Sequence, residues 1–200
     1  MTNNNETPNA THNKIPTEFE TERLILKVLD ETYGAEVLRF YENNARVFEP
    51  VEPPRAPGFY STGYQTRVLL FEKKEFQAER FLRLYMFQKE YPKQIIGSIC
   101  FNQIRQDTFH SCILGYKQDS CFCRKGFMEE ALSYCLNDLL PNNYSLHRVE
   151  ATVLPSNKRS VRLLDKLGFE EIGLIPDYVY IDGGWKDHLL YSKILSSTKC

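Results

Sequence analysis

The sequence lacks a surplus of charge of either sign. Its 25 lysine and arginine residues are balanced by 26 aspartate and glutamate residues, so the formal net charge at pH 7 is -1. A protein that binds nucleic acid or a membrane surface by bulk electrostatics needs an excess of positive charge. We therefore expect neither class of partner, although a local basic site is compatible with this composition.

Long apolar runs and paired cysteines are also missing. No stretch approaches the roughly 20 apolar residues that a membrane helix needs, and no secretory signal peptide is recognised. The six cysteines include no C-x-x-C pair and no second pair at the spacing of zinc ligands. We expect a cytoplasmic protein with reduced thiols and without a metal site.

The hydrophobic content of 42% in 200 residues is sufficient for one core, and we expect a single domain over residues 20–196. Residues 1–19 are polar, include three consecutive asparagines and show no periodicity, so we expect them to be disordered or loosely attached. Residues 49–64 are rich in proline, which excludes a regular helix or a central strand there. Long ordered loops of this kind are often functional.

Hydrophobic periodicity predicts the remaining elements. Strands are expected at residues 23–29, 80–90, 94–104, 108–118, 147–154, 169–175 and 188–194, and helices at residues 30–48, 65–76, 124–140 and 157–168. The three consecutive strands form an antiparallel meander, and strands and helices alternate after it. This order indicates an α/β fold of the α+β type, with a mixed, mostly antiparallel sheet of six to seven strands flanked by about four helices.

The expected start of the third helix has an unusual composition. Helix starts favour acidic side chains, because the macrodipole is positive there, yet "CFCRKGF" places Arg124, Lys125 and Gly126 at this point. Free helix N–H groups, two cations and a glycine that permits close approach suit a pyrophosphate. The same residues are equally typical of a solvated surface turn. The nucleotide patterns G-x-x-x-x-G-K-S/T and G-x-G-x-x-G are absent, and coenzyme A is the remaining common ligand of a strand–loop–helix pyrophosphate site.

Two stretches, "LGYKQDSCFCRKGFMEEAL" and "HRVEATVLPSNKRSVRLLDKLGF", resemble the GNAT superfamily of acetyl-CoA-dependent N-acetyltransferases. The phosphate loop of that family reads Q/R-x-x-G-x-G/A, and its second signature is N-x-x-S/A leading to K-x-G-F. This sequence departs from the family's loop at Cys123, at Arg124, which replaces a frequent glycine, and at Met128. "TERLILKVL" and the proline-rich segment resemble the ribosomal-protein-alanine N-acetyltransferase branch, in which an acidic, proline-rich segment borders the acceptor site.

The resemblance implies a cofactor site. The strands at residues 108–118 and 147–154 are expected to separate, with the thioester of acetyl-CoA between them. The residues expected to bind the cofactor are Tyr116, Lys117 and Gln118 through their backbone, the loop residues Arg124, Lys125, Gly126, Phe127 and Met128, and Asn157. Glu49 and Glu52 are expected to bind the acceptor, although an acidic loop is also typical of solvated surface.

Catalytic roles are harder to assign. Many relatives protonate the leaving thiolate with a tyrosine where this sequence has Leu164, so we expect Ser160 to act as acid or hydrogen-bond donor. Glu150 is the expected general base, because burial beside the cleft raises a carboxyl pKa; a strand glutamate paired with a neighbouring cation is the alternative. His147 and His188 are weaker candidates, since lone histidines on strands are more often structural.

The resemblance implies transfer of an acetyl group from acetyl-CoA directly to a primary amine, in the first place the N-terminal α-amine of a ribosomal protein. An acceptor such as an antibiotic or polyamine, and a CoA-binding module without catalysis, are the alternatives. We expect no bound metal, no nucleic acid and no membrane partner, and either a monomer or a homodimer.

Overall fold

The computed structural model describes residues 15–195. Its centre is one mixed sheet of eight strands in the order β1-β2-β3-β4-β5-β6-β8-β7. The strands are β1 (Glu18–Glu20), β2 (Leu24–Lys27), β3 (Leu82–Gln88), β4 (Ile95–Arg105), β5 (Ser111–Gln118), β6 (Arg148–Val153), β7 (Glu170–Ile181) and β8 (Gly184–Ile194). All neighbours pair antiparallel except β5 and β6, which are parallel. The predicted fold class and the predicted meander, β3 to β5, are confirmed.

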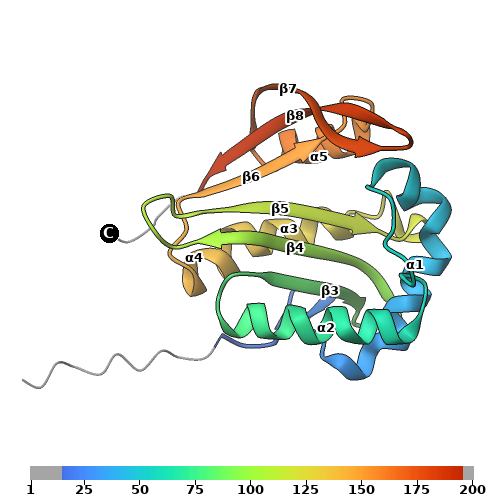
Figure 1. The fold of residues 1–200 in the computed structure, drawn as a ribbon. Coiled ribbons are helices and arrows are strands. Elements are labelled where there is room, and N and C mark those ends of the chain that lie inside the picture. The colour runs from blue at the N-terminus through green and yellow to red at the C-terminus, as the bar shows by residue number, and fades with distance from the viewer. Residues whose placement is uncertain (1–14, 196–200) are drawn as a thin grey trace, which may run out of the picture.

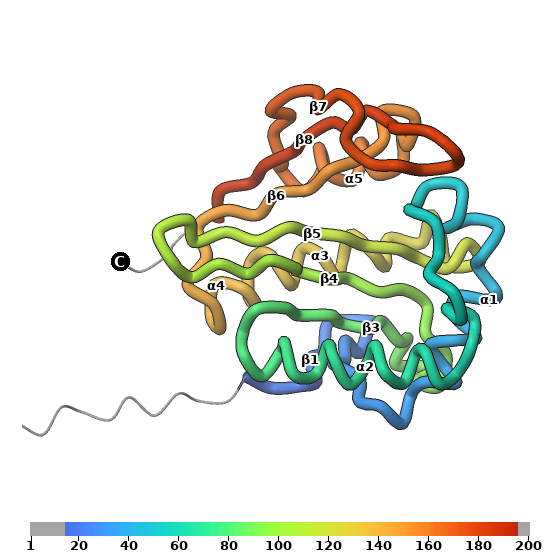
Figure 2. Tube along the Cα trace, in the orientation of Figure 1, coloured from blue at the N-terminus to red at the C-terminus, as the bar shows by residue number. Residues whose placement is uncertain are grey.

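Helices cover both faces of the sheet (Figures 1 and 2). Helices α1 (Gly34–Phe48) and α2 (Thr62–Gln77) lie on one face, and α3 (Phe127–Tyr134), α4 (Leu140–Asn143) and α5 (Lys158–Lys166) lie on the other. A π-helical turn at Cys135–Leu139 joins α3 to α4. Within residues 15–195 the helices therefore form four continuous segments, as predicted. None of the helices described is both long and apolar enough to cross a membrane.

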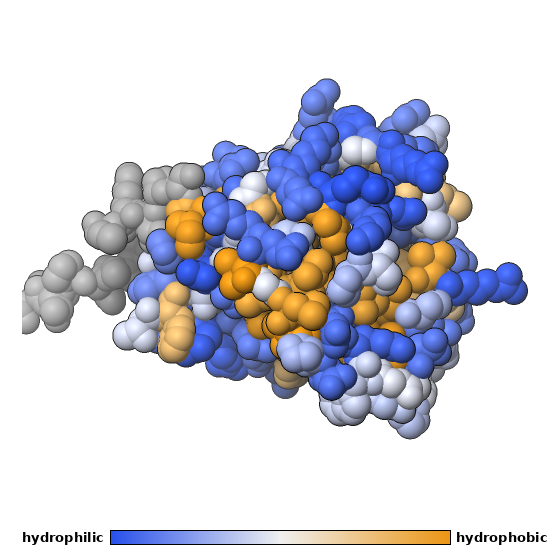
Figure 3. Space-filling model, turned by 90° about the horizontal axis from the view of Figure 1, so that it is seen from above, coloured by the Kyte–Doolittle hydropathy of each residue, from blue (hydrophilic) through white to orange (hydrophobic). Residues whose placement is uncertain are grey.

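The core is divided between the two faces because successive side chains of a strand point to opposite sides. Leu84 and Met86 of β3 pack with α3 and the strands around it, whereas Tyr85 and Phe87 pack with α1 and α2. Figure 3 views the molecule from above, and hydrophobic side chains gather within a hydrophilic rim on that face. Ile172 of β7 is among the exposed apolar residues of the molecule.

Two boundaries differ from the predictions. Residues 18–20 form β1, the eighth strand, and Phe19 is buried against the ring of Tyr134, so residues 18 and 19, which were expected to be irregular, belong to the sheet. The expectation for residues 1–14 lies outside the described residues. In addition, β7 and β8 form one long hairpin through residues 176–187, because Asp182 and Gly183 both adopt positive φ (48° and 73°) as a tight hairpin turn requires.

Candidate active site

The site begins where β5 and β6 separate. They pair only from Ser111–Arg148 to Leu114–Ala151, and the described chain has no strand between them beyond that point. The predicted separation of these strands is therefore confirmed. Two adjoining cavities lie there, a larger one of about 430 Å³ and a smaller one of about 170 Å³. The residues that line both are Val51, Glu52, Tyr116, Asn157 and Ser160.

In the loop that leads from β5 into α3, Cys123 lines the larger cavity, whereas Arg124, Lys125 and Gly126 line neither cavity. Arg124 and Lys125 precede the helix, which begins at Phe127, and Gly126 is its left-handed N-cap with φ 78°. The prediction that the cations stand in the first helical turn was therefore wrong. That turn contains Glu129 and Glu130 instead, as the macrodipole favours. The two cations belong to the loop, whose backbone is bent by a positive φ of 63° at Arg124.

A distant arginine braces this loop. The Arg23 guanidinium donates to the backbone carbonyl of Lys125 at 3.0 Å, forms an ion pair with Glu130 at 2.6 Å and lies 4.7 Å from the centre of the Phe127 ring. Burial opposes ionisation of Glu130, but hydrogen bonds from Thr21 and Arg23 hold its pKa below the usual range. Arg23 lies about a hundred positions earlier in the chain, and its strand position gave no sign of this role.

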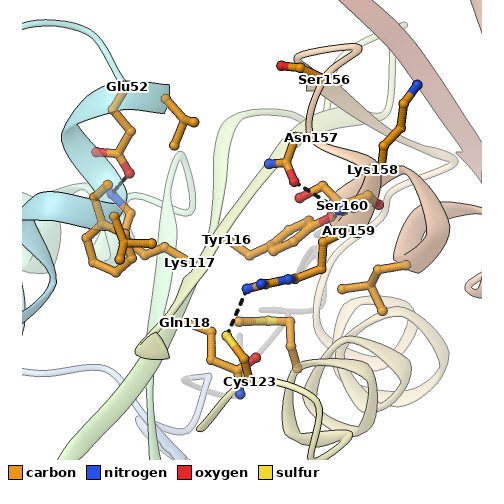
Figure 4. Close-up of a pocket in the computed structure, with 15 residues that line it drawn as sticks. Glu52, Tyr116, Lys117, Gln118, Cys123, Ser156, Asn157, Lys158, Arg159 and Ser160 are labelled. Atoms are coloured by element: carbon orange, nitrogen blue, oxygen red, sulfur yellow. Dashed lines mark hydrogen bonds and ion pairs between the residues drawn. The ribbon is translucent and has the colours of Figure 1, made fainter. Parts of the chain in front are cut away.

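Like Arg23, Arg159 reaches this loop from another part of the chain, in this case from α5. Arg159 reaches across the larger cavity and donates from Nη1 to Sγ of Cys123 at 3.0 Å (Figure 4). Cys123 stands where the family pattern has glutamine or arginine. A guanidinium from another element thus occupies this end of the cavity, which the sequence alone did not predict.

In the wall formed by β5, the side chains already have protein partners, and the backbone edge is what remains available to a ligand. The Tyr116 hydroxyl points to the start of α5, Lys117 pairs with Glu52, and the Gln118 amide donates to the carbonyl of Phe122. The strand pairs with β4 through Gln118, but its β6-facing edge is without a strand partner in the described chain after Leu114. Such an edge presents free N–H and C=O groups, which suit an extended amide-containing ligand.

The opposite wall is the start of α5. Asn157 caps the helix, with its side-chain oxygen accepting from the backbone N–H of Ser160 at 3.2 Å, as predicted. The Tyr116 hydroxyl donates to the Ser160 carbonyl at 3.4 Å. Burial raises the pKa of Tyr116 to about 12, although hydrogen bonding with the Ser160 side chain opposes the shift. Leu164 lines the smaller cavity, at the position where many relatives carry a tyrosine.

The two predicted acceptor-binding acids are in different places. Glu52 lines both cavities, but its carboxylate is held between Lys117 at 2.6 Å and Arg55 at 2.5 Å (Figure 4 shows the first pair). Its charge is therefore already offset by two cations. Glu49 lines neither cavity; it accepts a hydrogen bond from the Tyr60 hydroxyl at 2.6 Å on the surface.

Some of the remaining predicted residues line a cavity and others do not. Met128 lines the larger cavity with a buried side chain, whereas Phe127 is buried below the loop and can offer only its backbone. Glu150 lines neither cavity, because it lies where β5 still pairs with β6, opposite Ile113, and its nearest cation is Arg148 at 3.6 Å. The alternative reading of Glu150 as a paired strand residue fits this position. His188, which was given less weight, is buried and lines the smaller cavity.

Among the described residues, no cluster of three or more histidine, cysteine, aspartate or glutamate side chains is arranged to hold an ion. The arrangement instead combines a cationic loop, a free strand edge and a small cavity lined by hydroxyl and imidazole groups.

Known proteins are similar to this chain in sequence and in architecture. The family model of the acetyltransferase (GNAT) domain matches residues 23–170. The ribosomal protein uS5-alanine N-acetyltransferase of Escherichia coli (strain K12) is 33% identical over 171 residues, which is 85% of this chain and 87% of the relative. The probable N-acetyltransferase YjcK of Bacillus subtilis (strain 168) is 29% identical over 167 residues, 82% of this chain and 90% of the relative.

Solved structures agree. The ribosomal-protein-S5-alanine acetyltransferase from Vibrio fischeri superposes with a TM-score of 0.86 at 27% identity, over 92% of this chain and all of the other. Mycobacterium smegmatis RimJ in complex with CoA-disulfide gives a TM-score of 0.78 at 23% identity, over 90% of this chain and 88% of the other, a likeness of fold. The chain therefore belongs to the GNAT acetyltransferase family and is an N-acetyltransferase.

Proposed function

We propose that this protein transfers the acetyl group of acetyl-CoA to the N-terminal α-amine of a protein, in the first place a ribosomal protein. The observation that carries this proposal is the 33% identity to the uS5-alanine N-acetyltransferase of Escherichia coli over 85% of the chain. The separation of β5 from β6 supports it, because the larger cavity there extends from Cys123, next to the two loop cations, to Val51 and Glu52 of the proline-rich segment.

Each wall has a distinct task in this proposal. Arg124, Lys125 and the N–H groups at the start of α3 bind the pyrophosphate of acetyl-CoA, with Arg159 as a third cation. The edge of β5 after Leu114 binds the pantetheine amides and orients the thioester. Ser160 donates a hydrogen bond to the departing sulfur. Holding the two reactants together supplies several kcal/mol of the rate enhancement, on the order of 7–11 in well-oriented systems.

The acceptor is expected to be an α-amine rather than a lysine. An α-amine has a pKa of about 7.7–8.0, whereas that of lysine is about 10.4, so far more of the α-amine is neutral at pH 7. The test is a peptide that begins with alanine and carries one internal lysine, incubated with acetyl-CoA and analysed by tandem mass spectrometry. The proposal predicts a single acetyl group on the terminal nitrogen. Acetylation of the lysine alone, or no release of CoA, would contradict it.

A further inference from the structure

The smaller cavity contains a group that the expected mechanism does not use. His188 on β8 is 6% exposed and lines this cavity together with Ser160 and Tyr116. The acceptor of an N-acetyltransferase arrives largely as an ammonium ion at pH 7, because the pKa of an α-amine is about 7.7–8.0. A group that accepts a proton beside the acceptor nitrogen is therefore useful, and Glu150 does not line the cavity.

Three ionisable side chains, Glu52, Tyr116 and His188, line the smaller cavity. Burial raises the pKa of Tyr116 to about 12, so its hydroxyl stays protonated at neutral pH and is not a base. Glu52 is paired with Lys117 and Arg55, and a proton on either oxygen would displace a cation. This leaves the imidazole of His188.

The hydrogen bond of His188 fixes which nitrogen is free. Its Nδ1 lies 3.0 Å from the carbonyl oxygen of Lys186. A carbonyl oxygen can only accept, so Nδ1 carries the hydrogen and the neutral ring keeps an unprotonated Nε2. The ring of Tyr178 packs edge-on against the imidazole, with centres 5.5 Å apart, and limits its rotation. The imidazole is thus held in the tautomer that a base requires.

We propose that His188 is the general base that removes a proton from the acceptor ammonium in the smaller cavity. This inference rests on the proposed function. The ammonium N–H bond breaks, the proton passes to Nε2 and then to solvent, and the neutral amine keeps its lone pair. That lone pair forms the C–N bond to the thioester carbon. The C–S bond then breaks with its electrons on sulfur, the amide nitrogen loses one further proton, and the thiolate takes up one.

The test compares His188→Asn with the wild type, using acetyl-CoA and the alanine-initiated peptide. Asparagine keeps a donor near the position of Nδ1 for the Lys186 carbonyl but offers no base. At pH 7 we expect kcat to fall about 100-fold, within the usual range for a lost general base, with the KM for acetyl-CoA unchanged. The wild-type kcat divided by that of His188→Asn should decrease towards pH 9, where most of the acceptor amine is already neutral.

The pH profile distinguishes a base from a structural residue. A merely structural loss lowers the rate by the same factor at pH 7 and pH 9, and that result would overturn the proposal. The titratable groups around His188 are Tyr178 from β7, whose ring contacts the imidazole, and Glu52 and Tyr116, which line the same cavity; all three are unchanged in the variant. His110→Asn is the matched control, because its Nδ1 also lies against a carbonyl, that of Ser145, outside both cavities.

A second measurement needs neither a variant nor an acceptor. Nitrogen-15 NMR of the wild-type imidazoles at neutral to mildly alkaline pH should give the Nδ1–H tautomer for His188. The Nε2–H tautomer would overturn the proposal even if His188→Asn failed to fold. If the wild-type protein failed to release CoA with the peptide while the tautomer was as expected, the choice of acceptor would be wrong rather than the assignment of the base.

Discussion

At the scale of single residues, the site depends on side chains whose partners lie far away in the sequence. Tyr116 illustrates this dependence, because its hydroxyl meets the Ser160 carbonyl across the gap between β5 and α5. Lys117, expected to contribute only its backbone, also holds Glu52 at 2.6 Å. The chemistry of each residue type was predictable from the sequence, but these partnerships were not.

The unfolding free energy of Tyr116→Phe should fall less than that of the wild type as the pH rises above 9. The pKa of Tyr116 is raised from 10.0 to about 12, so the folded state holds the proton more tightly than the unfolded chain. Its contribution is fully present below pH 10 and is lost as the pH rises towards 12. Between pH 9 and 11 the wild type should lose about 1–2 kcal/mol more unfolding free energy than Tyr116→Phe.

Urea unfolding at the two pH values measures this difference. Tyr178→Phe, in which the substituted side chain is 41% exposed, is the control. An equal loss in wild type and Tyr116→Phe would show that Tyr116 ionises as readily in the folded protein as in the unfolded chain.

Ser160→Ala tests the proposed hydrogen bond to the leaving sulfur. The cap of α5 uses the backbone N–H of Ser160, so removal of the hydroxyl should leave the helix and the thermal midpoint intact. We expect kcat to fall about 10- to 100-fold with little change in the KM for acetyl-CoA, as steady-state kinetics would measure. Ser133→Ala in α3 is the control, and equal rates for both variants would remove Ser160 from the mechanism.

At the scale of elements, the loop before α3 is the most informative segment. Its cations looked misplaced as part of a helix, and the structure accounts for them by starting the helix later, after Gly126. The stripe of apolar residues in α3 was predictable, because Phe127, Ala131 and Cys135 recur at helical spacing and are all buried. The exact start of the helix depends on a left-handed glycine and on Arg23, which periodicity does not report.

Charge reversal in this loop should affect binding rather than folding. Arg124→Glu combined with Lys125→Glu removes two cations and adds two anions beside the expected pyrophosphate. Since a hydrogen bond to a charged group contributes about 1.5–3 kcal/mol, the Kd for acetyl-CoA should rise at least about 100-fold at low salt. Calorimetric titration measures the Kd, and urea unfolding measures the stability.

Arg67→Glu combined with Lys74→Glu makes the same change of charge on α2, on the other face of the sheet. This control should bind acetyl-CoA as the wild type does. Equal weakening in both double variants would mean that only the overall field of the protein attracts the cofactor.

At the scale of the whole molecule, the fold was largely predictable and the active site only partly so. Alternating apolar residues predicted the meander, and the second family signature predicted the capped start of α5. The assignment of the loop before α3 to the cofactor stays a prediction. The hairpin of β7 and β8 was underestimated, although the dipeptide Asp182-Gly183 is a hairpin signal. Glu150 lines neither cavity, and a strand position alone does not say how far two strands stay paired.

The central claim is that the cavity between β5 and β6 binds acetyl-CoA, and a thermal-shift titration tests it most directly. A ligand at 100 times its Kd adds about 2.7 kcal/mol to stability. For a chain of this size the midpoint should rise by roughly 5–10 °C and then saturate. The loop variant with both charges reversed should need far more ligand for the same rise. No shift of the wild type at millimolar acetyl-CoA would contradict the account.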